Sequence, residues 1–299
     1  MYILKYLFRL IFILLSVAFF TLLERKFLGY IHERKGPNKL FIVGLFQPFS
    51  DALKLFNKGD IKSKDLNLVV YFFFSSFCLF LRVYFWGIVS FWGVLFFSNY
   101  SLLFVICVLG MGVYFLLFMG WCRNTKFSLL GRYRSSAQSI SYEVIIIFII
   151  LFLFFIYFFF NFLEVICLGL MGRFFFISIL MFFIWVLSCL AECNRSPFDF
   201  SEGESELVSG FNTEYRGGLF SFIFIGEYSS ILILSFLTSN LFFCFFYIFF
   251  LFWLISFLYL WVRGSFPRLR YDFLIIIAWK SLCLLVLFSF FIFLVGFNL

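Results

Sequence analysis

The sequence has little charge, and this shortage excludes whole classes of protein. Charged residues make up only 13% of the 299 residues, about half the share of a soluble globular domain. Hydrophobic residues make up 65%, and the mean hydropathy is +1.10. A water-soluble enzyme, a disordered chain and a disulfide scaffold are excluded, because none of them carries so much apolar surface. The composition therefore predicts an all-α integral membrane protein.

Motifs for metal and nucleotide binding are also missing. The eight cysteines form no CxxC pair, so the clustered thiolates of a zinc or iron–sulfur site are not expected. His32 is the only histidine and cannot build a metal site by itself. Neither a GxGxxG motif nor a P-loop occurs, so we expect no bound nucleotide. A nucleic-acid partner is not expected either.

Long apolar runs are abundant, and phenylalanine, with 57 copies, dominates them. This bias is typical of an AT-rich genome, and an organellar genome fits it. Because about 20 helical residues cross a hydrocarbon layer, the runs predict a single transmembrane domain over residues 1–299 with about eight helices. The join between the sixth and seventh, at Thr238, Ser239 and Asn240, is very short. The predicted spans are about 3–23, 68–88, 101–121, 143–160, 174–191, 217–237, 241–260 and 273–296.

The basic residues are distributed unevenly. Of the 23 Lys and Arg residues, 19 lie in the odd-numbered connections between these spans. The positive-inside rule places those connections on the cytoplasmic or matrix side and both termini on the other side. All four prolines also lie in odd connections, so structured loops are expected on that face. The other four basic residues lie near a terminus, in the outer part of the second span or in the fourth connection: Lys5, Arg9, Arg82 and Arg173.

A short amphipathic helix is predicted in the first connection. Pro48 suits the first turn of a helix, and apolar residues recur between Phe49 and Phe56 at the spacing of one helical face. The helix is too short to span a bilayer, so it lies along the membrane surface or covers a cavity. A simple interfacial anchor explains the same pattern.

Acidic residues gather in the connection at 191–216 and also occur inside two spans. The connection holds six carboxylates against two arginines. Crowded carboxylates raise one another's pKa values, which permits proton exchange near neutral pH, although a solvated acidic loop has the same composition. Glu143 opens the fourth span and Glu227 lies within the sixth, where an ionisable residue is costly and indicates a functional site. Together with Glu192 they suit a proton path; carboxylates satisfied by a neighbouring helix are the alternative.

Five segments carry a more specific signal: ERKFLGYIHERKGPN at 24–38, GLFQPFSDALKLFNK at 44–58, AQSISYE at 137–143, AECNRSPFDFSEGESELVSGFNTEY at 191–215, and FPRLRYDFLIIIAWK at 266–280. In order and spacing these segments resemble the subunit 1 (H subunit) family of the proton-pumping NADH:ubiquinone oxidoreductase, respiratory complex I. They cover about a quarter of the chain.

The resemblance implies an eight-helix bundle of the mitochondrial inner membrane with matrix-side loops and both termini on the intermembrane side. It implies ubiquinone as the substrate of a chamber open to membrane lipid, and flavin and iron–sulfur clusters on partner subunits of complex I. This chain alone would hold no complete active site. The resemblance assigns Glu24, Arg25, Asp51, Lys54, Arg195 and Arg270 to the quinone chamber, and Glu143, Glu192, Asp199, Glu202, Glu204, Glu206, Glu214 and Glu227 to the proton path.

Two other functions fit the same residues. A membrane-bound hydrogenase complex uses a related subunit without quinone, and the metal content of its peripheral partner would distinguish it. A stand-alone proton-coupled transporter also places acids within its spans. Such a transporter would be active as a purified chain, whereas a complex I subunit requires its partners.

Overall fold

The computed structural model describes residues 2–59, 67–89, 101–122, 125–157, 175–199, 215–243 and 248–298. Within these ranges the backbone forms helices joined by turns and loops, and the predicted all-α integral membrane fold is confirmed. The elements are α1 (Tyr2–Ile31), η1 (Ile42–Gly44), α2 (Gln47–Phe56), α3 (Leu68–Val89), α4 (Ser101–Trp121), α5 (Lys126–Tyr157), α7 (Phe175–Glu192), α9 (Gly217–Phe242), α10 (Ile248–Ser265), α11 (Tyr271–Ile276), η4 (Ile277–Leu282) and α12 (Cys283–Asn298).

Six helices of the described part are long and apolar enough to cross a membrane. They are α1, α3, α4, α5, α9 and the continuous helix formed by α11, η4 and α12. Apolar segments in α7 and α10 are shorter in the part of the chain that the structure describes. A helix therefore lies at each of the eight predicted positions, and the number of spans stays a prediction.

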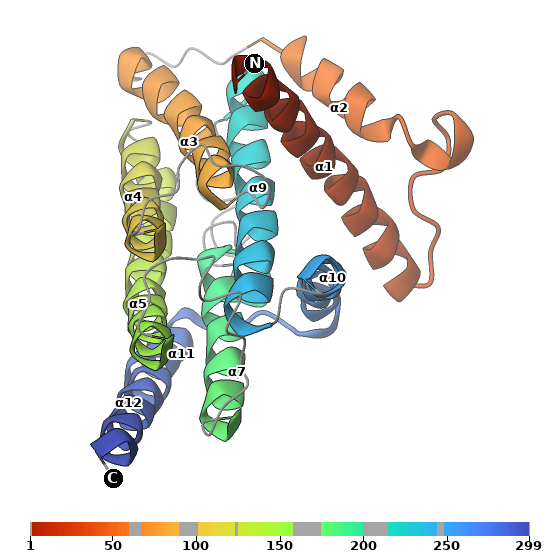
Figure 1. Cartoon of the computed structure of the whole chain (residues 1–299). Helices are drawn as coiled ribbons and strands as arrows, with labels where there is room; N and C mark the ends of the chain where they lie inside the picture. The colour runs from red at the N-terminus through yellow and green to blue at the C-terminus, as the bar shows by residue number, and fades with distance from the viewer. Residues whose placement is uncertain are drawn as a thin grey trace.

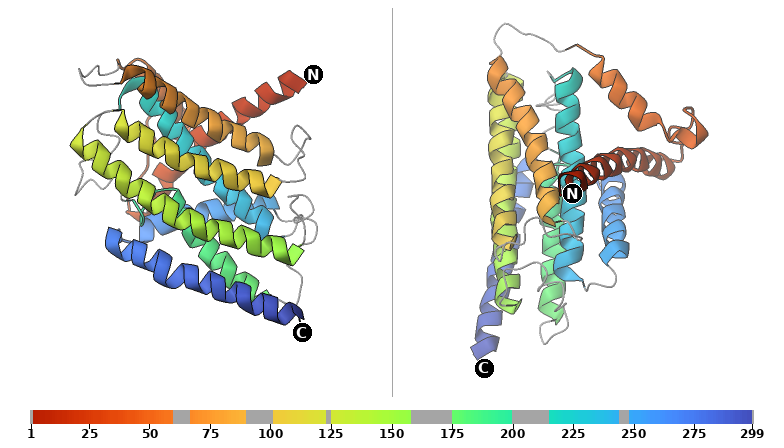
Figure 2. Two further views of the ribbon diagram at one scale, coloured as in Figure 1. Left: turned by 90° about the vertical axis from the view of Figure 1, so that its left-hand side faces the viewer. Right: turned by 45° about the horizontal axis from the view of Figure 1, so that its top comes forward.

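Helix α9 is the centre of the bundle. It contacts α1, α2, α3, α7 and α10, while α4 packs on α5 and α5 packs on α7 (Figure 1). Figure 2 shows α1 leaning away from the other helices and α2 lying outside the bundle. Buried apolar side chains such as Phe152, Trp185 and Leu237 form the main core. Large apolar side chains also cover the outer surface, as expected for helices surrounded by lipid.

Helix α5 begins at Lys126, well before the predicted start of the fourth span at residue 143. Glu143 therefore lies inside the helix and does not open it, while the start of the membrane span at residue 143 stays a prediction. The preceding serines do not interrupt the helix, because their hydroxyls donate to carbonyls one turn earlier, as Ser139 Oγ does to Ser136 O at 3.1 Å. Hydropathy assigns such a polar but buried segment to a loop.

Helix α9 continues through the residues predicted to join two spans. It ends at Phe242, and Thr238, Ser239 and Asn240 are buried inside it. Thr238 Oγ1 donates to Ser235 O at 2.7 Å. Because a polar side chain bonded to its own helix is tolerated at membrane depth, the predicted boundary was wrong and the helix is longer.

Helix α1 also extends beyond its predicted end at residue 23, to Ile31. Its charged residues Glu24 and Arg25 therefore lie in the helix and not in the following loop. Each forms an ion pair with another element, Glu24 with Arg263 of α10 and Arg25 with Asp51 of α2. Pairing offsets the cost of placing these charges near an apolar segment.

The amphipathic helix predicted in the first connection is α2, with Pro48 in its first turn. It contacts both α1 and α9. The ring of Phe56 lies against Phe222 of α9, with 6.5 Å between the ring centroids. The apolar residues of α2 thus serve packing on two other helices, in addition to any contact with lipid.

Candidate functional site

Two ion pairs connect the C-terminal part of α1 to its neighbours. Glu24 is buried, with 3% of its surface exposed, and pairs with Arg263. The next residue, Arg25, has a half-exposed side chain and pairs with Asp51. The structure therefore brings together three residues of the predicted quinone chamber and adds Arg263, which sequence reasoning missed.

The Arg25–Asp51 pair lies at an accessible edge between α1 and α2. Gln47 Nε2 donates to Asp51 Oδ1 at 3.0 Å, which orients this carboxylate. Lys54 is exposed on the same helix. Charged donors beside the apolar surfaces of two helices suit a ligand with a polar headgroup and an apolar tail.

Arg195 forms the third ion pair, with Glu227 of α9. Its Nη2 lies 3.2 Å from Glu227 Oε2, and its guanidinium lies 4.7 Å from the ring centroid of Tyr228. A cation over an aromatic face is held by the ring quadrupole. The two side chains are only 10% and 24% exposed, so removal of either would leave a poorly hydrated charge.

Buried Gln138 of α5 holds the loop that carries Arg195. Its Nε2 donates to the carbonyls of Ala191 and Phe198 at 2.8 and 2.9 Å. These two carbonyls lie on either side of Arg195 in the sequence. The loop backbone is thereby fixed to α5, and Arg195 has a defined position.

A cavity of about 40 Å³ lies inside the helix bundle. Four charged residues from four helices line it: Arg82, Arg132, Glu192 and Glu227. A water molecule needs about 10–15 Å³ of such volume, so there is room for more than one. Glu192 is 8% exposed, and its Oε2 has no hydrogen-bond partner among the described residues. A carboxylate that faces a polar cavity of this size is suited to proton transfer.

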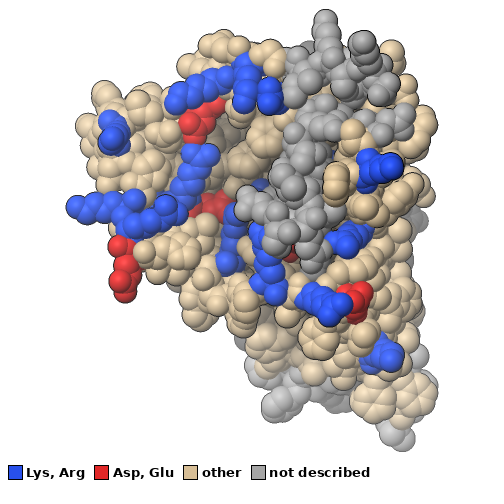
Figure 3. Space-filling view, turned by 180° about the vertical axis from the view of Figure 1, so that it is seen from behind, with Lys and Arg blue, Asp and Glu red and all other residues tan. Residues whose placement is uncertain are grey.

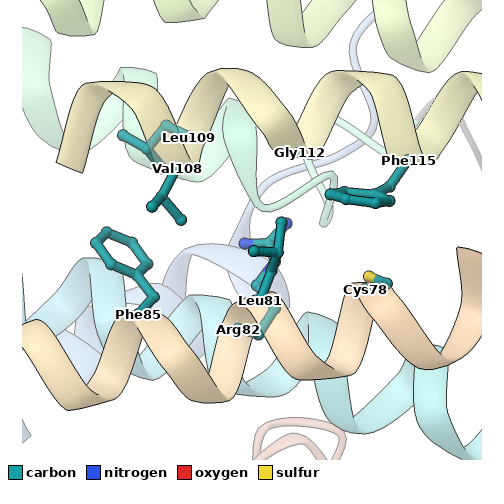
Figure 4. Close-up of a pocket in the computed structure, with 8 residues that line it drawn as sticks. All are labelled: Cys78, Leu81, Arg82, Phe85, Val108, Leu109, Gly112 and Phe115. Carbon is teal, nitrogen blue, oxygen red and sulfur yellow. The ribbon is translucent and has the colours of Figure 1, made fainter. Parts of the chain in front are cut away.

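Sequence reasoning missed Arg82 as a site residue. Its side chain extends from α3 toward Gly112 of α4 and lines a smaller cavity of about 10 Å³ (Figure 4). A Cβ added to Gly112 would lie 3.7 Å from Arg82 Nη2. The signal was present, because an arginine inside an apolar run is as costly as a glutamate. Arg132 gave no such signal, because its polar surroundings in the sequence resemble a loop.

Glu143 faces α4 from the middle part of α5. A Cβ added to Gly110 would lie 2.7 Å from Glu143 Oε1, so the glycine leaves space for the carboxylate. Neighbouring Tyr142 is buried, and its hydroxyl donates to Leu274 O at 3.3 Å. The carboxylate thus lies where α5 packs on α4.

The other predicted site residues are dispersed. Asp199 Oδ2 lies 3.6 Å from Arg268 Nη2. Arg270 has an 85% exposed side chain and lies 3.4 Å from Asp272, so it does not join the pairs on α1. On the face seen in Figure 3, Lys and Arg side chains gather with acidic side chains among them. Glu202, Glu204, Glu206 and Glu214 lie outside the described residues.

The loop after α7 also carries a buried thiol. Cys193 lines the 40 Å³ cavity. Burial, and to a smaller extent the Glu192 carboxylate, raises the pKa of Cys193 to about 12. The thiol is therefore protonated at neutral pH and adds no charge to the cavity.

Comparisons with known proteins agree with the five sequence segments. Residues 4–294 match the family model of NADH dehydrogenase. The NADH-ubiquinone oxidoreductase chain 1 of Anopheles gambiae is 45% identical over 275 residues, which are 90% of this chain and 87% of the relative. Chain 1 of Artemia franciscana is 46% identical and covers 92% of both chains. Chain 1 of Locusta migratoria is 45% identical over 94% of this chain and 91% of the relative.

Proposed function

Because the chain belongs to the NADH dehydrogenase family and is similar throughout to NADH-ubiquinone oxidoreductase chain 1, we propose that it is a membrane subunit of respiratory complex I. Its partners are then the other membrane subunits and the peripheral subunits. The flavin and the iron–sulfur clusters lie on the peripheral partners. The names of the relatives favour this role over a hydrogenase subunit or a stand-alone transporter. The protein resides in the mitochondrial inner membrane, with the basic connections in the matrix and both termini in the intermembrane space.

The edge between α1 and α2 forms part of a ubiquinone chamber in this proposal. Arg25 supplies a guanidinium that steers or hydrogen-bonds the polar headgroup. Asp51 holds the guanidinium in place, and Lys54 adds positive charge nearby. The apolar surfaces of α1 and α2 accommodate the isoprenoid tail.

The buried charged groups carry the second half of the proposal, the coupling to proton movement. Reduction of a quinone consumes protons and changes the charge in its chamber. Glu192 and Glu227 line one cavity with two arginines, so their protonation states depend on the charges around them. We propose that Glu143, Glu192 and Glu227 pass this change along the membrane helices, and that the acidic loop after Asp199 supplies or accepts the protons.

Replacement of Arg25 by alanine tests the headgroup role. We expect quinone reduction by the assembled complex to fall about ten-fold or more, because a hydrogen bond to a charged group is lost. Oxidation of NADH by an artificial acceptor should persist, because that reaction needs only the peripheral subunits. Both rates are measured on the same membranes.

The matched control is Arg34→Ala, which removes the same charge from an exposed position in the loop after α1. This variant should retain both activities. Equal loss of both activities in an assembled Arg25→Ala complex would refute the headgroup role and indicate a defect before the quinone.

A second variant tests the position of Glu143. Gly110→Ala should displace the carboxylate, since the added Cβ would lie 2.7 Å from its Oε1. Only the end of a flexible side chain must move, so the complex should still assemble. Misplacement of a reacting group by about 1 Å can lower the reaction rate about 10²-fold. We therefore expect turnover to fall, but by less than this factor. Gly59→Ala is the control, because among the described residues no atom other than those of its chain neighbours lies within 4 Å of its added Cβ. Equal turnover in both variants would contradict a role for Glu143 at this position.

A further inference from the structure

A third cavity, of about 20 Å³, lies between α1, α9, α10 and the end of α7. Glu24, Arg195, Tyr259 and Arg263 supply its polar lining, and the rest of its wall is mainly apolar. The cavity is therefore lined by both residues of the Glu24–Arg263 ion pair and by Arg195 of the Arg195–Glu227 ion pair. It is distinct from the accessible edge of α1 and α2, and it shares only Cys193 with the lining of the larger cavity around Glu192.

Two polar atoms at this cavity have unmet hydrogen-bonding capacity. Glu24 uses Oε1 for its ion pair with Arg263, and its Oε2 is buried with no hydrogen-bond partner among the described residues. The buried hydroxyl of Tyr259 lies beside the side chains of Cys189 and Thr238, but it forms no hydrogen bond of good geometry within the part of the chain that the structure describes. Glu24 and Tyr259 are only 3% and 4% exposed. Buried polar atoms are rarely left in this state, because an unmet hydrogen bond is costly away from water.

We propose that the cavity binds one water molecule that connects the two ion pairs. Its volume exceeds the roughly 10–15 Å³ that a water requires, and its lining offers the two to four polar partners that hold a buried water. The water accepts a hydrogen bond from the Tyr259 hydroxyl and one from the Arg195 guanidinium. It donates a hydrogen bond to Glu24 Oε2.

This water site deepens the proposed function and rests on it for its consequence. Arg195 is shared, because it contacts Glu227 directly at 3.2 Å and Glu24 through the water. A change of charge at Glu24, beside the proposed quinone chamber, therefore alters the surroundings of Glu227 in the proposed proton path. Tyr259 is a positioning residue, because it acts only by holding the water.

The direct test is a density map of the assembled complex at a resolution that shows buried water. We expect one peak within hydrogen-bond distance of both Glu24 Oε2 and Tyr259 Oη. Absence of a peak there, in a map that shows water at similar depth elsewhere, would overturn the water site. This measurement needs no activity, so it separates failure of the water site from failure of the quinone role, which Arg25→Ala tests.

The functional test compares two tyrosine variants in the assembled complex. Tyr259→Phe should lower quinone-linked turnover about two- to ten-fold, as for the loss of one hydrogen bond. Tyr215→Phe is the matched control, because this buried hydroxyl donates to Met119 O at 3.0 Å, away from the cavity. The carboxyl band of Glu24 in the redox infrared difference spectrum, assigned by its loss in Glu24→Gln, should move in Tyr259→Phe and stay in Tyr215→Phe.

A double-mutant cycle tests the connection between the pairs. Glu24→Gln and Glu227→Gln should be non-additive by at least about two-fold in turnover. In the Tyr259→Phe background their effects should become closer to additive. An unmoved Glu24 band and an unchanged coupling in that background would refute the proposed connection.

Discussion

The Glu192→Gln variant is expected to assemble but to lose about 10²-fold of its quinone-linked turnover, the lower end of what a positioned proton-transferring group contributes. Glutamine keeps the shape of the side chain and fits the same polar cavity, but it cannot release a proton. Because electron transfer and proton movement are coupled in the proposed mechanism, proton translocation should fall in the same proportion. Both are measured on sealed vesicles with NADH as the donor.

Glu33→Gln is the matched control, because it makes the same chemical change at an exposed loop position. It should keep full turnover. Near-normal turnover and pumping in Glu192→Gln would show that this carboxylate is structural. Loss of assembly in Glu192→Gln would also contradict the relay role, because a relay can be removed without loss of the fold.

Replacement of Arg195 by methionine is expected to destabilise the subunit by about 3–5 kcal/mol, the cost of leaving one charge of a buried pair alone. The charge left behind is Glu227, whose side chain is only 24% exposed. We expect little assembled complex in native gels and a lower thermal midpoint for the remainder. Arg34→Met, at an exposed position, should have no such effect.

The double variant Arg195→Met/Glu227→Gln separates charge from packing. If the unpaired carboxylate causes the instability, the second change should restore most of the assembled complex, while turnover stays low. If the double variant is as unstable as Arg195→Met, the loss comes from the contact of the guanidinium with Tyr228, 4.7 Å from its ring centroid. In that case the ion pair is not the stabilising feature.

The sequence predicted the helices well where an apolar pattern marks them. Helix α2 was predicted from Pro48 and a helical spacing of apolar residues, and it is present. The boundaries of α5 and α9 were missed, because serine and threonine hydroxyls bond to their own helix and neighbouring helices bury them. Hydropathy alone cannot distinguish such a residue from one in a loop.

The candidate site was predicted in part. Its acids were identifiable, since a carboxylate such as Glu227 is unusual inside an apolar run. The ion-pair partners of the acids could not be identified from the sequence. Glu24 and Arg263, for example, lie near opposite ends of the chain, and only the packing of α1 on α10 brings them together. Arg82 was identifiable by the same rule that selected the acids, whereas the burial of Arg132 depends on the packing of α4 on α5.

The charge spacing along α1 has a consequence for the surrounding lipid. Between Arg9 and Glu24 the helix has 14 uncharged residues, a rise of about 21 Å. A typical hydrocarbon layer is about 30 Å thick, so the uncharged stretch of α1 is shorter than the bilayer beside it. Such hydrophobic mismatch is relieved by local thinning of the bilayer and by the outward reach of the Arg9 side chain. The headgroup layer is then drawn inward at α1, which brings the lipid headgroups closer to the Arg25–Asp51 pair.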